Sequence, residues 1–103
     1  MIVCVTKEEE HFLHKGNVIV NFVSETCARC EYLTRYVDHL AKTNPSLVFA
    51  SVNARLEPDL VFKFGIHELP SVVFLSNGHE KGRVTGVDEV ALWNLVQRAR
   101  QQL

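Results

Sequence analysis

Two cysteines, Cys27 and Cys30, enclose the dipeptide Ala28-Arg29. They follow an apolar run at residues 18–23 and precede a stretch with helical periodicity. Thiols at this spacing can open and close a disulfide with little backbone movement. Unpaired backbone N–H groups and the dipole at a helix start favour an anion, so Cys27 should form a thiolate more readily than a free cysteine. Cys30, one turn later, can displace whatever Cys27 has attacked. The motif predicts thiol–disulfide exchange.

The elements that must position this pair follow the order βαβαβαββα. Strands are expected at residues 2–5, 18–23, 47–52, 71–75 and 83–85, and helices at 6–16, 27–42, 58–65 and from 88 onward. This alternation implies an α/β fold with a mixed central sheet and helices on both faces. The continuous apolar run at 18–23 is typical of a central strand. Asn77-Gly78 predicts a hairpin, so the last two strands should be antiparallel.

Composition limits the class of protein. The chain has 103 residues, enough for one hydrophobic core, so residues 1–103 should form a single domain. The formal net charge of −1 and an apolar content of 47% do not suggest a nucleic-acid or membrane partner. No segment approaches the ~20 apolar residues that span a bilayer. Three cysteines, an odd number, are unlike a secreted disulfide scaffold, so a protein of the cytoplasm or of another reducing compartment is expected.

Four features of the sequence, in their order along the chain, resemble thioredoxin. They are the strand at 18–23, the Cys-x-x-Cys motif at the next helix start, the segment 63–70 (Lys-Phe-Gly-Ile-His-Glu-Leu-Pro) and the Asn77-Gly78 hairpin. The resemblance covers essentially the whole chain and implies the thioredoxin fold.

The resemblance also implies roles for individual residues. Cys27 would be the attacking thiolate and Cys30 the resolving cysteine of a protein-disulfide oxidoreductase. Pro70 would be cis and face the disulfide, with Leu69 offering its backbone to an extended substrate segment. Gly86 matches a glycine that lets a partner's backbone approach.

The partners implied are protein disulfide substrates and a reductase such as thioredoxin reductase, which uses NADPH. The exchange needs no bound cofactor, and the protein is expected to act as a monomer in electron transport and cell redox homeostasis. Its five histidines are scattered, with no second Cys-x-x-Cys and no His-x₃-His pair, so no metal site is expected.

The active-site motif departs from the usual Trp-Cys-Gly-Pro-Cys of thioredoxins. Thr26 stands where the tryptophan would provide an apolar contact beside the sulfurs. Arg29 puts a positive charge where a proline is usual, and this charge either stabilises the Cys27 thiolate or is screened by solvent. The sequence therefore predicts a changed recognition surface.

A second departure lies in the central strand, where thioredoxins bury an aspartate and this chain has Asn21. That aspartate is thought to take the proton from the resolving cysteine. An amide cannot accept this proton, although it can hold a water that relays one. Slower resolution by Cys30 is the hypothesis that follows.

Two other functions fit parts of the sequence. Thr26 and Asn21 raise the alternative of a catalytically weak adaptor or regulatory binding module with the same fold. Gly86-Val87-Asp88 partly matches a glutathione-binding element of glutaredoxins, but the complete strand and helix before the cysteines speak against that class.

Two side chains outside the motif are expected to be structural. Cys4, in the first strand, should be a small buried hydrophobe. Trp93, on the apolar face of the last helix, should belong to the core.

Overall fold

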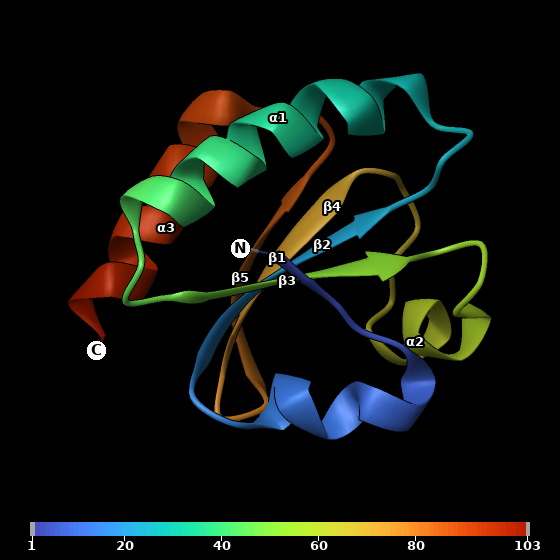
Figure 1. The fold of residues 1–103 in the computed structure, drawn as a ribbon, viewed down its shortest axis with the longest axis horizontal. Coiled ribbons are helices and arrows are strands. Elements are labelled where there is room, and N and C mark those ends of the chain that lie inside the picture. Colours follow the sequence, from blue (N-terminus) through green and yellow to red (C-terminus); the bar gives the residue numbers. More distant parts are fainter. Residues whose placement is uncertain (1, 103) are drawn as a thin grey trace.

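The computed structural model describes residues 2–102, and within this range a five-stranded mixed sheet runs through the molecule in the order β1-β3-β2-β4-β5 (Figure 1). The strands are β1 (Ile2–Cys4), β2 (Asn17–Val23), β3 (Val48–Asn53), β4 (Ser71–Ser76) and β5 (His79–Thr85). β1, β3 and β2 are parallel, whereas β4 is antiparallel to β2 and to β5. The apolar run is the middle strand, as predicted, and the Asn77-Gly78 turn joins β4 to β5.

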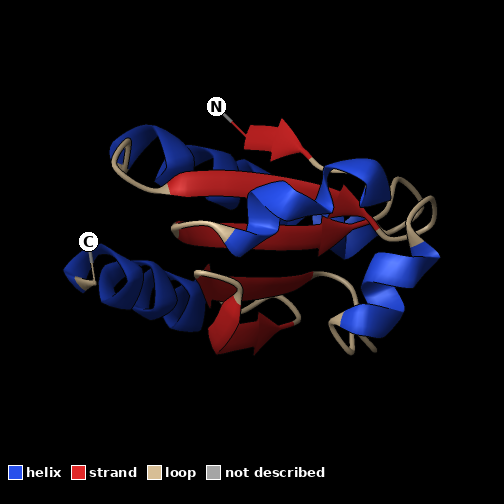
Figure 2. Ribbon diagram, turned by 90° about the horizontal axis from the view of Figure 1, so that it is seen from below, coloured by secondary structure: helices blue, strands red, loops and turns tan. Residues whose placement is uncertain are grey.

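Helices cover both faces of this sheet (Figures 1 and 2). α1 (Ala28–Thr43) and α3 (Glu89–Gln101) pack on one face, around buried residues such as Ile19 and Phe74. η1 (Lys7–His14) and α2 (Pro58–Lys63) lie on the other face of the sheet. There they pack against residues adjacent in sequence to those on the first face, among them Val18 and Val73. Side chains alternate between the faces of a strand, so a continuously apolar β2 supplies both cores.

The element predicted at residues 6–16 has the expected start but a different type. The Glu9 carboxylate accepts a hydrogen bond from the backbone N–H of Thr6 at 3.3 Å, in the predicted capping arrangement. The helix that follows is a 3₁₀-helix whose buried residue is Leu13. Its first turn carries three successive glutamates and little apolar surface, so nothing favours a regular amphipathic α-helix here.

Two predictions of burial are wrong. Cys4 is exposed because β1 is a three-residue edge strand that pairs with β3 on one side only. Trp93 is 50% exposed and its neighbour Val90 is 74% exposed. The side of α3 that packs against the protein is narrower than the apolar face predicted from the sequence. Its buried residues are Leu92, Leu95, Val96 and Ala99.

Within residues 2–102, no helix has both the length and the apolar character that crossing a membrane requires.

Candidate active site

Cys27 and Cys30 meet where β2 passes into α1, at the upper right of Figure 1. They form a disulfide with a Cα–Cα distance of 5.2 Å. Cys27 caps α1, because its Sγ accepts a hydrogen bond from the backbone N–H of Cys30 at 3.2 Å. Cys30 is buried, with 2% of its surface exposed, whereas Cys27 is half-buried. The more exposed of the two cysteines is therefore also the one at the positive end of the helix.

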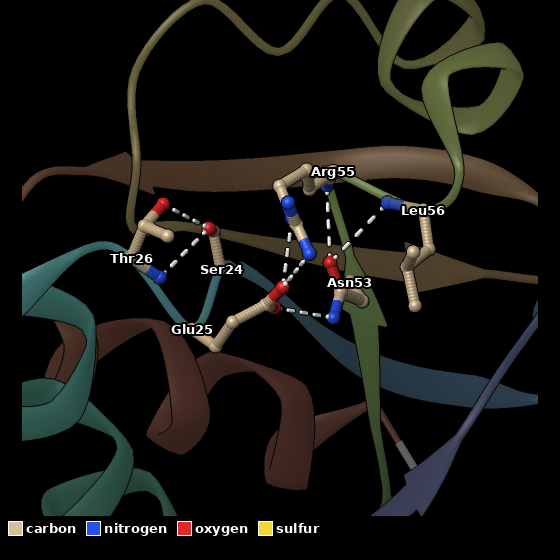
Figure 3. A network of polar contacts seen from close by, with 6 residues as sticks. All are labelled: Ser24, Glu25, Thr26, Asn53, Arg55 and Leu56. Atoms are coloured by element: carbon tan, nitrogen blue, oxygen red, sulfur yellow. Dashed lines mark hydrogen bonds and ion pairs between the residues drawn. The ribbon is translucent and has the colours of Figure 1, made fainter.

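A tight turn leads into this cap. The backbone N–H of Cys27 donates to the Ser24 carbonyl at 3.2 Å. The Ser24 hydroxyl accepts from the backbone N–H of Thr26 at 3.2 Å and lies 2.9 Å from the Thr26 hydroxyl (Figure 3). Such side-chain bonds to the local backbone stabilise turns. Thr26, Ala28 and Arg29 are all exposed next to the disulfide.

The turn is tied to the end of the neighbouring strand by a network that the sequence analysis missed. The Glu25 carboxylate accepts hydrogen bonds from Asn53 Nδ2 at 2.7 Å and from Arg55 Nε at 2.8 Å (Figure 3). The Asn53 Oδ1 in turn accepts from the backbone N–H groups of Arg55 and Leu56, at 3.1 and 3.3 Å. β2 and β3 are parallel, so their C-terminal ends lie at the same end of the sheet. The predicted order of the elements was the signal in the sequence that could have indicated this proximity.

Hydrogen bonds stabilise the charge on Glu25. A bond from its own backbone N–H, then those from Asn53 and Arg55, hold the pKa of the carboxyl below its usual range. Glu25 therefore remains ionised two residues before Cys27, and Arg55 supplies the compensating positive charge at 2.7 Å.

The segment before β4 forms the other side of the site. The Leu69–Pro70 peptide bond is cis, as the resemblance implies, and Pro70 is buried. Arg29 reaches this segment from α1 and donates from Nη2 to the Leu69 carbonyl at 3.4 Å. The backbone N–H of Gly86 donates to the Pro70 carbonyl at 2.8 Å. Gly86 has φ +81°, and a Cβ there would lie 2.9 Å from Glu68 Oε2, so this position favours glycine.

Asn21 lies inside the protein rather than on this surface. Its side chain is 2% exposed, and Oδ1 has no hydrogen-bond partner among the described residues 2–102. In register it stands between Ser51 of β3 and Val72 of β4. It shares the face of β2 with Ile19, the face that α1 covers. Asn21 thus occupies the buried position expected of it, beneath the helix that Cys27 caps and that contains Cys30.

A shallow hollow opens beside the disulfide. Besides both cysteines it is lined by residues of the turn and of the first half of α1, including Glu25, Thr26, Glu31 and Arg35. Among residues 2–102, no group of three or more His, Cys, Asp and Glu side chains gathers as metal ligands would.

The chain is similar to several known proteins. The Thioredoxin family model matches residues 1–98. The chain is 30% identical over 83 residues to mitochondrial thioredoxin-2 of Schizosaccharomyces pombe, covering 81% of this chain and 62% of that protein. It is 36% identical over 86 residues to phosducin-like protein 3 of Dictyostelium discoideum, covering 80% of this chain and 47% of that protein. The chain thus spans less than two thirds of the length of either relative.

A solved structure agrees over almost the full length of both chains. The X-ray structure of Fasciola hepatica thioredoxin superposes with a TM-score of 0.86 at 25% identity, covering 96% of this chain and 99% of that one.

Proposed function

Because the chain belongs to the thioredoxin family, we propose that it is a protein-disulfide oxidoreductase acting through Cys27 and Cys30. The observation that carries the proposal is the disulfide itself: a half-buried Cys27 caps α1 and is bonded to a buried Cys30 within the thioredoxin fold. The adaptor alternative is not favoured, because a pair so placed can undergo reversible exchange.

The reaction begins with the reduced pair. The Cys27 thiolate attacks one sulfur of a partner disulfide, and the other partner sulfur leaves as a thiolate that takes up a proton. Cys30 then loses its proton and attacks Cys27 Sγ, which releases the second partner thiol. Two partner thiols and the Cys27–Cys30 disulfide result, so two electrons pass to the partner. A two-electron reductant must then restore the dithiol.

The remaining site residues act on recognition and proton transfer. Thr26, Ala28 and Arg29 shape the exposed surface around Cys27, and Leu69 offers its backbone to the substrate beside Pro70. Gly86 leaves room for a partner's backbone near the Pro70 carbonyl. Asn21 holds a water that relays the proton from Cys30, since its unpartnered Oδ1 can accept a hydrogen bond.

The cellular setting belongs to the same proposal. Protein disulfides are the substrates and thioredoxin reductase the electron donor, in a monomeric, cytoplasmic protein that serves electron transport and redox homeostasis. A formal net charge of −1 supports the absence of a nucleic-acid or membrane partner. The odd number of cysteines supports a reducing compartment.

Reduction of insulin disulfides tests the activity, driven first by dithiothreitol and then by NADPH with thioredoxin reductase. Cys27→Ser should abolish turnover, and Cys30→Ser should accumulate a mixed disulfide between Cys27 and insulin. Cys4→Ser is the matched control, because Cys4 lies on the exposed edge strand and should be dispensable. Activity with the reductase would support a place in the thioredoxin system. No turnover from a folded protein with both thiols titratable would overturn the proposal in favour of an adaptor.

A further inference from the structure

We propose that Arg29 selects partner disulfides whose reacting cysteine is flanked by an aspartate or glutamate. This inference rests on the proposed function and names its substrate class. It follows from the position of Arg29, the pairing of the charges around it, and the hydrogen bonds that its guanidinium leaves unused.

Arg29 is exposed between the two cysteines, at the start of α1. Its Nη2 donates to the Leu69 carbonyl at 3.4 Å, so the guanidinium extends from the helix toward the segment before Pro70. In the proposed function a partner segment lies along the backbone of Leu69, so a partner that brings a sulfur to Cys27 lies beside both segments. The residues next to the partner's cysteine therefore come within reach of Arg29.

The other charges along this part of the chain are compensated in pairs. Glu25 is paired with Arg55 at 2.7 Å, and Glu31 with Arg35 at 3.4 Å. Among residues 2–102, no carboxylate lies within ion-pair distance of Arg29. The approach to Cys27 on the α1 side thus carries one uncompensated positive charge.

A carboxylate suits this charge better than any other side chain. The guanidinium has five N–H donors in a planar fork, and the bond to Leu69 uses one of them. A carboxylate can accept two parallel bonds from such a fork. The Glu68 carboxylate lies close to Gly86 and would repel an acidic residue placed there. The preference should therefore concern the residues beside the partner's cysteine.

The first exchange step tests this without requiring turnover. In a Cys30→Ser background, Cys27 attacks the cysteine sulfur of a peptide that carries thionitrobenzoate as a mixed disulfide. The coloured thionitrobenzoate anion leaves, and a Cys27–peptide disulfide forms. Three peptides differ only in the residues flanking their cysteine, which are aspartate, asparagine or lysine. The readout is the ratio of second-order rate constants among the peptides, which cancels any change in the intrinsic reactivity of Cys27.

We expect the aspartate peptide to react about two- to fivefold faster than the asparagine peptide, as for an exposed ion pair. The lysine peptide should be slower, and added salt should narrow the differences. Arg29→Gln should remove the preference and Arg29→Glu should invert it. Arg100→Gln is the matched control. It removes another exposed arginine with a 3.4 Å side-chain contact, but at the end of α3 near the C-terminus (Figure 1).

Equal rates for the three peptides, or an aspartate preference that survives in Arg29→Glu, would overturn the inference. Failure of the proposed function looks different, because insulin would then not be turned over while the ratio of exchange rates still reports on Arg29.

Discussion

Asn21 is a buried amide at the position in β2 where thioredoxins have an aspartate. Its side chain is 2% exposed and Oδ1 has no partner among residues 2–102, so a carboxylate there would be desolvated and its pKa raised. We predict that Asn21→Asp lowers the free energy of unfolding by about 1–3 kcal/mol near neutral pH. In return, the carboxylate can take the proton of Cys30, so resolution of a mixed disulfide should become faster.

The sign of the pH dependence follows from the raised pKa. An unfolded aspartate titrates near pH ~3.9, and the folded variant would hold its proton to a higher pH. The penalty should therefore be absent below the unfolded pKa and grow as the pH rises toward the folded one. Urea unfolding at about pH 4 and about pH 8, with the wild type beside it, measures this difference. Equal midpoints for the two proteins at the higher pH would contradict the prediction.

Arg55 compensates a charge close to the nucleophile. Its Nε donates a hydrogen bond at 2.8 Å to the carboxylate of Glu25, which lies two residues before Cys27. Arg55→Met leaves that carboxylate without its cation, so the thiolate of reduced Cys27 is less favoured. We expect the pH at which Cys27 alkylation is half-maximal to rise by a few tenths of a unit. The double variant Glu25→Gln/Arg55→Met should restore the wild-type profile. A rise that persists in the double variant would mean that Arg55 acts by shaping the turn and not by its charge.

At the scale of elements, hydrophobic periodicity predicted the order of strands and helices, and the position of the cysteines followed from it. Periodicity reports only which side chains are apolar, not how far a neighbouring element extends over them. Trp93 and Val90 are apolar but exposed, because the sheet reaches only the part of α3 that carries Leu92 and Leu95. Cys4 is exposed because β1 lies at the edge of the sheet. The sequence could not show this, because the place of β1 is set by its pairing with β3, which is a long-range contact.

The contact between β5 and α3 depends on a glycine. A Cβ on Gly82 would lie 2.7 Å from Leu95 Cδ1, and Leu95 is buried, so the methyl group has little room to move. We predict that Gly82→Ala lowers the free energy of unfolding by about 1–3 kcal/mol through overpacking.

A double-mutant cycle identifies the cause. Valine has no δ carbons, so Leu95→Val removes the atom that the new Cβ would meet, and Gly82→Ala should cost less in that background than in the wild type. Chemical denaturation of the four proteins gives the coupling energy. Additive effects would show that the loss arises elsewhere in β5.

The hydrogen-bond network of Glu25, Asn53 and Arg55 is the part of the candidate site that could not be predicted from the sequence. The Cys27–Cys30 pair could be predicted because both cysteines lie within one short segment of the sequence. Glu25, Asn53 and Arg55 come from the ends of two strands, and their contact depends on the register in which Val23 pairs with Asn53. Parallel pairing of β2 and β3 follows from the element order, but the length of each strand, and hence the residues that meet, does not.

For the whole molecule, one sheet separates two apolar clusters within residues 2–102. The α1 and α3 side includes Ile19 and Leu92, and the η1 and α2 side includes Leu13 and Val20. Because β2 contributes adjacent residues to both, neither cluster can form without the strand that the other stabilises. This shared strand supports the proposal that the chain forms a single cooperative domain.

The single tryptophan lets this cooperativity be tested across the sheet. Trp93 lies on α3, whereas Leu13 is fully buried under the opposite face. We predict that Leu13→Ala lowers the free energy of unfolding by about 2–5 kcal/mol, because it leaves a cavity in the core. Trp93 fluorescence and far-ultraviolet circular dichroism should report the same lowered midpoint in urea, as for two-state unfolding. If circular dichroism shifted while the fluorescence transition stayed at its wild-type midpoint, the two faces would unfold separately and the single-domain proposal would be wrong.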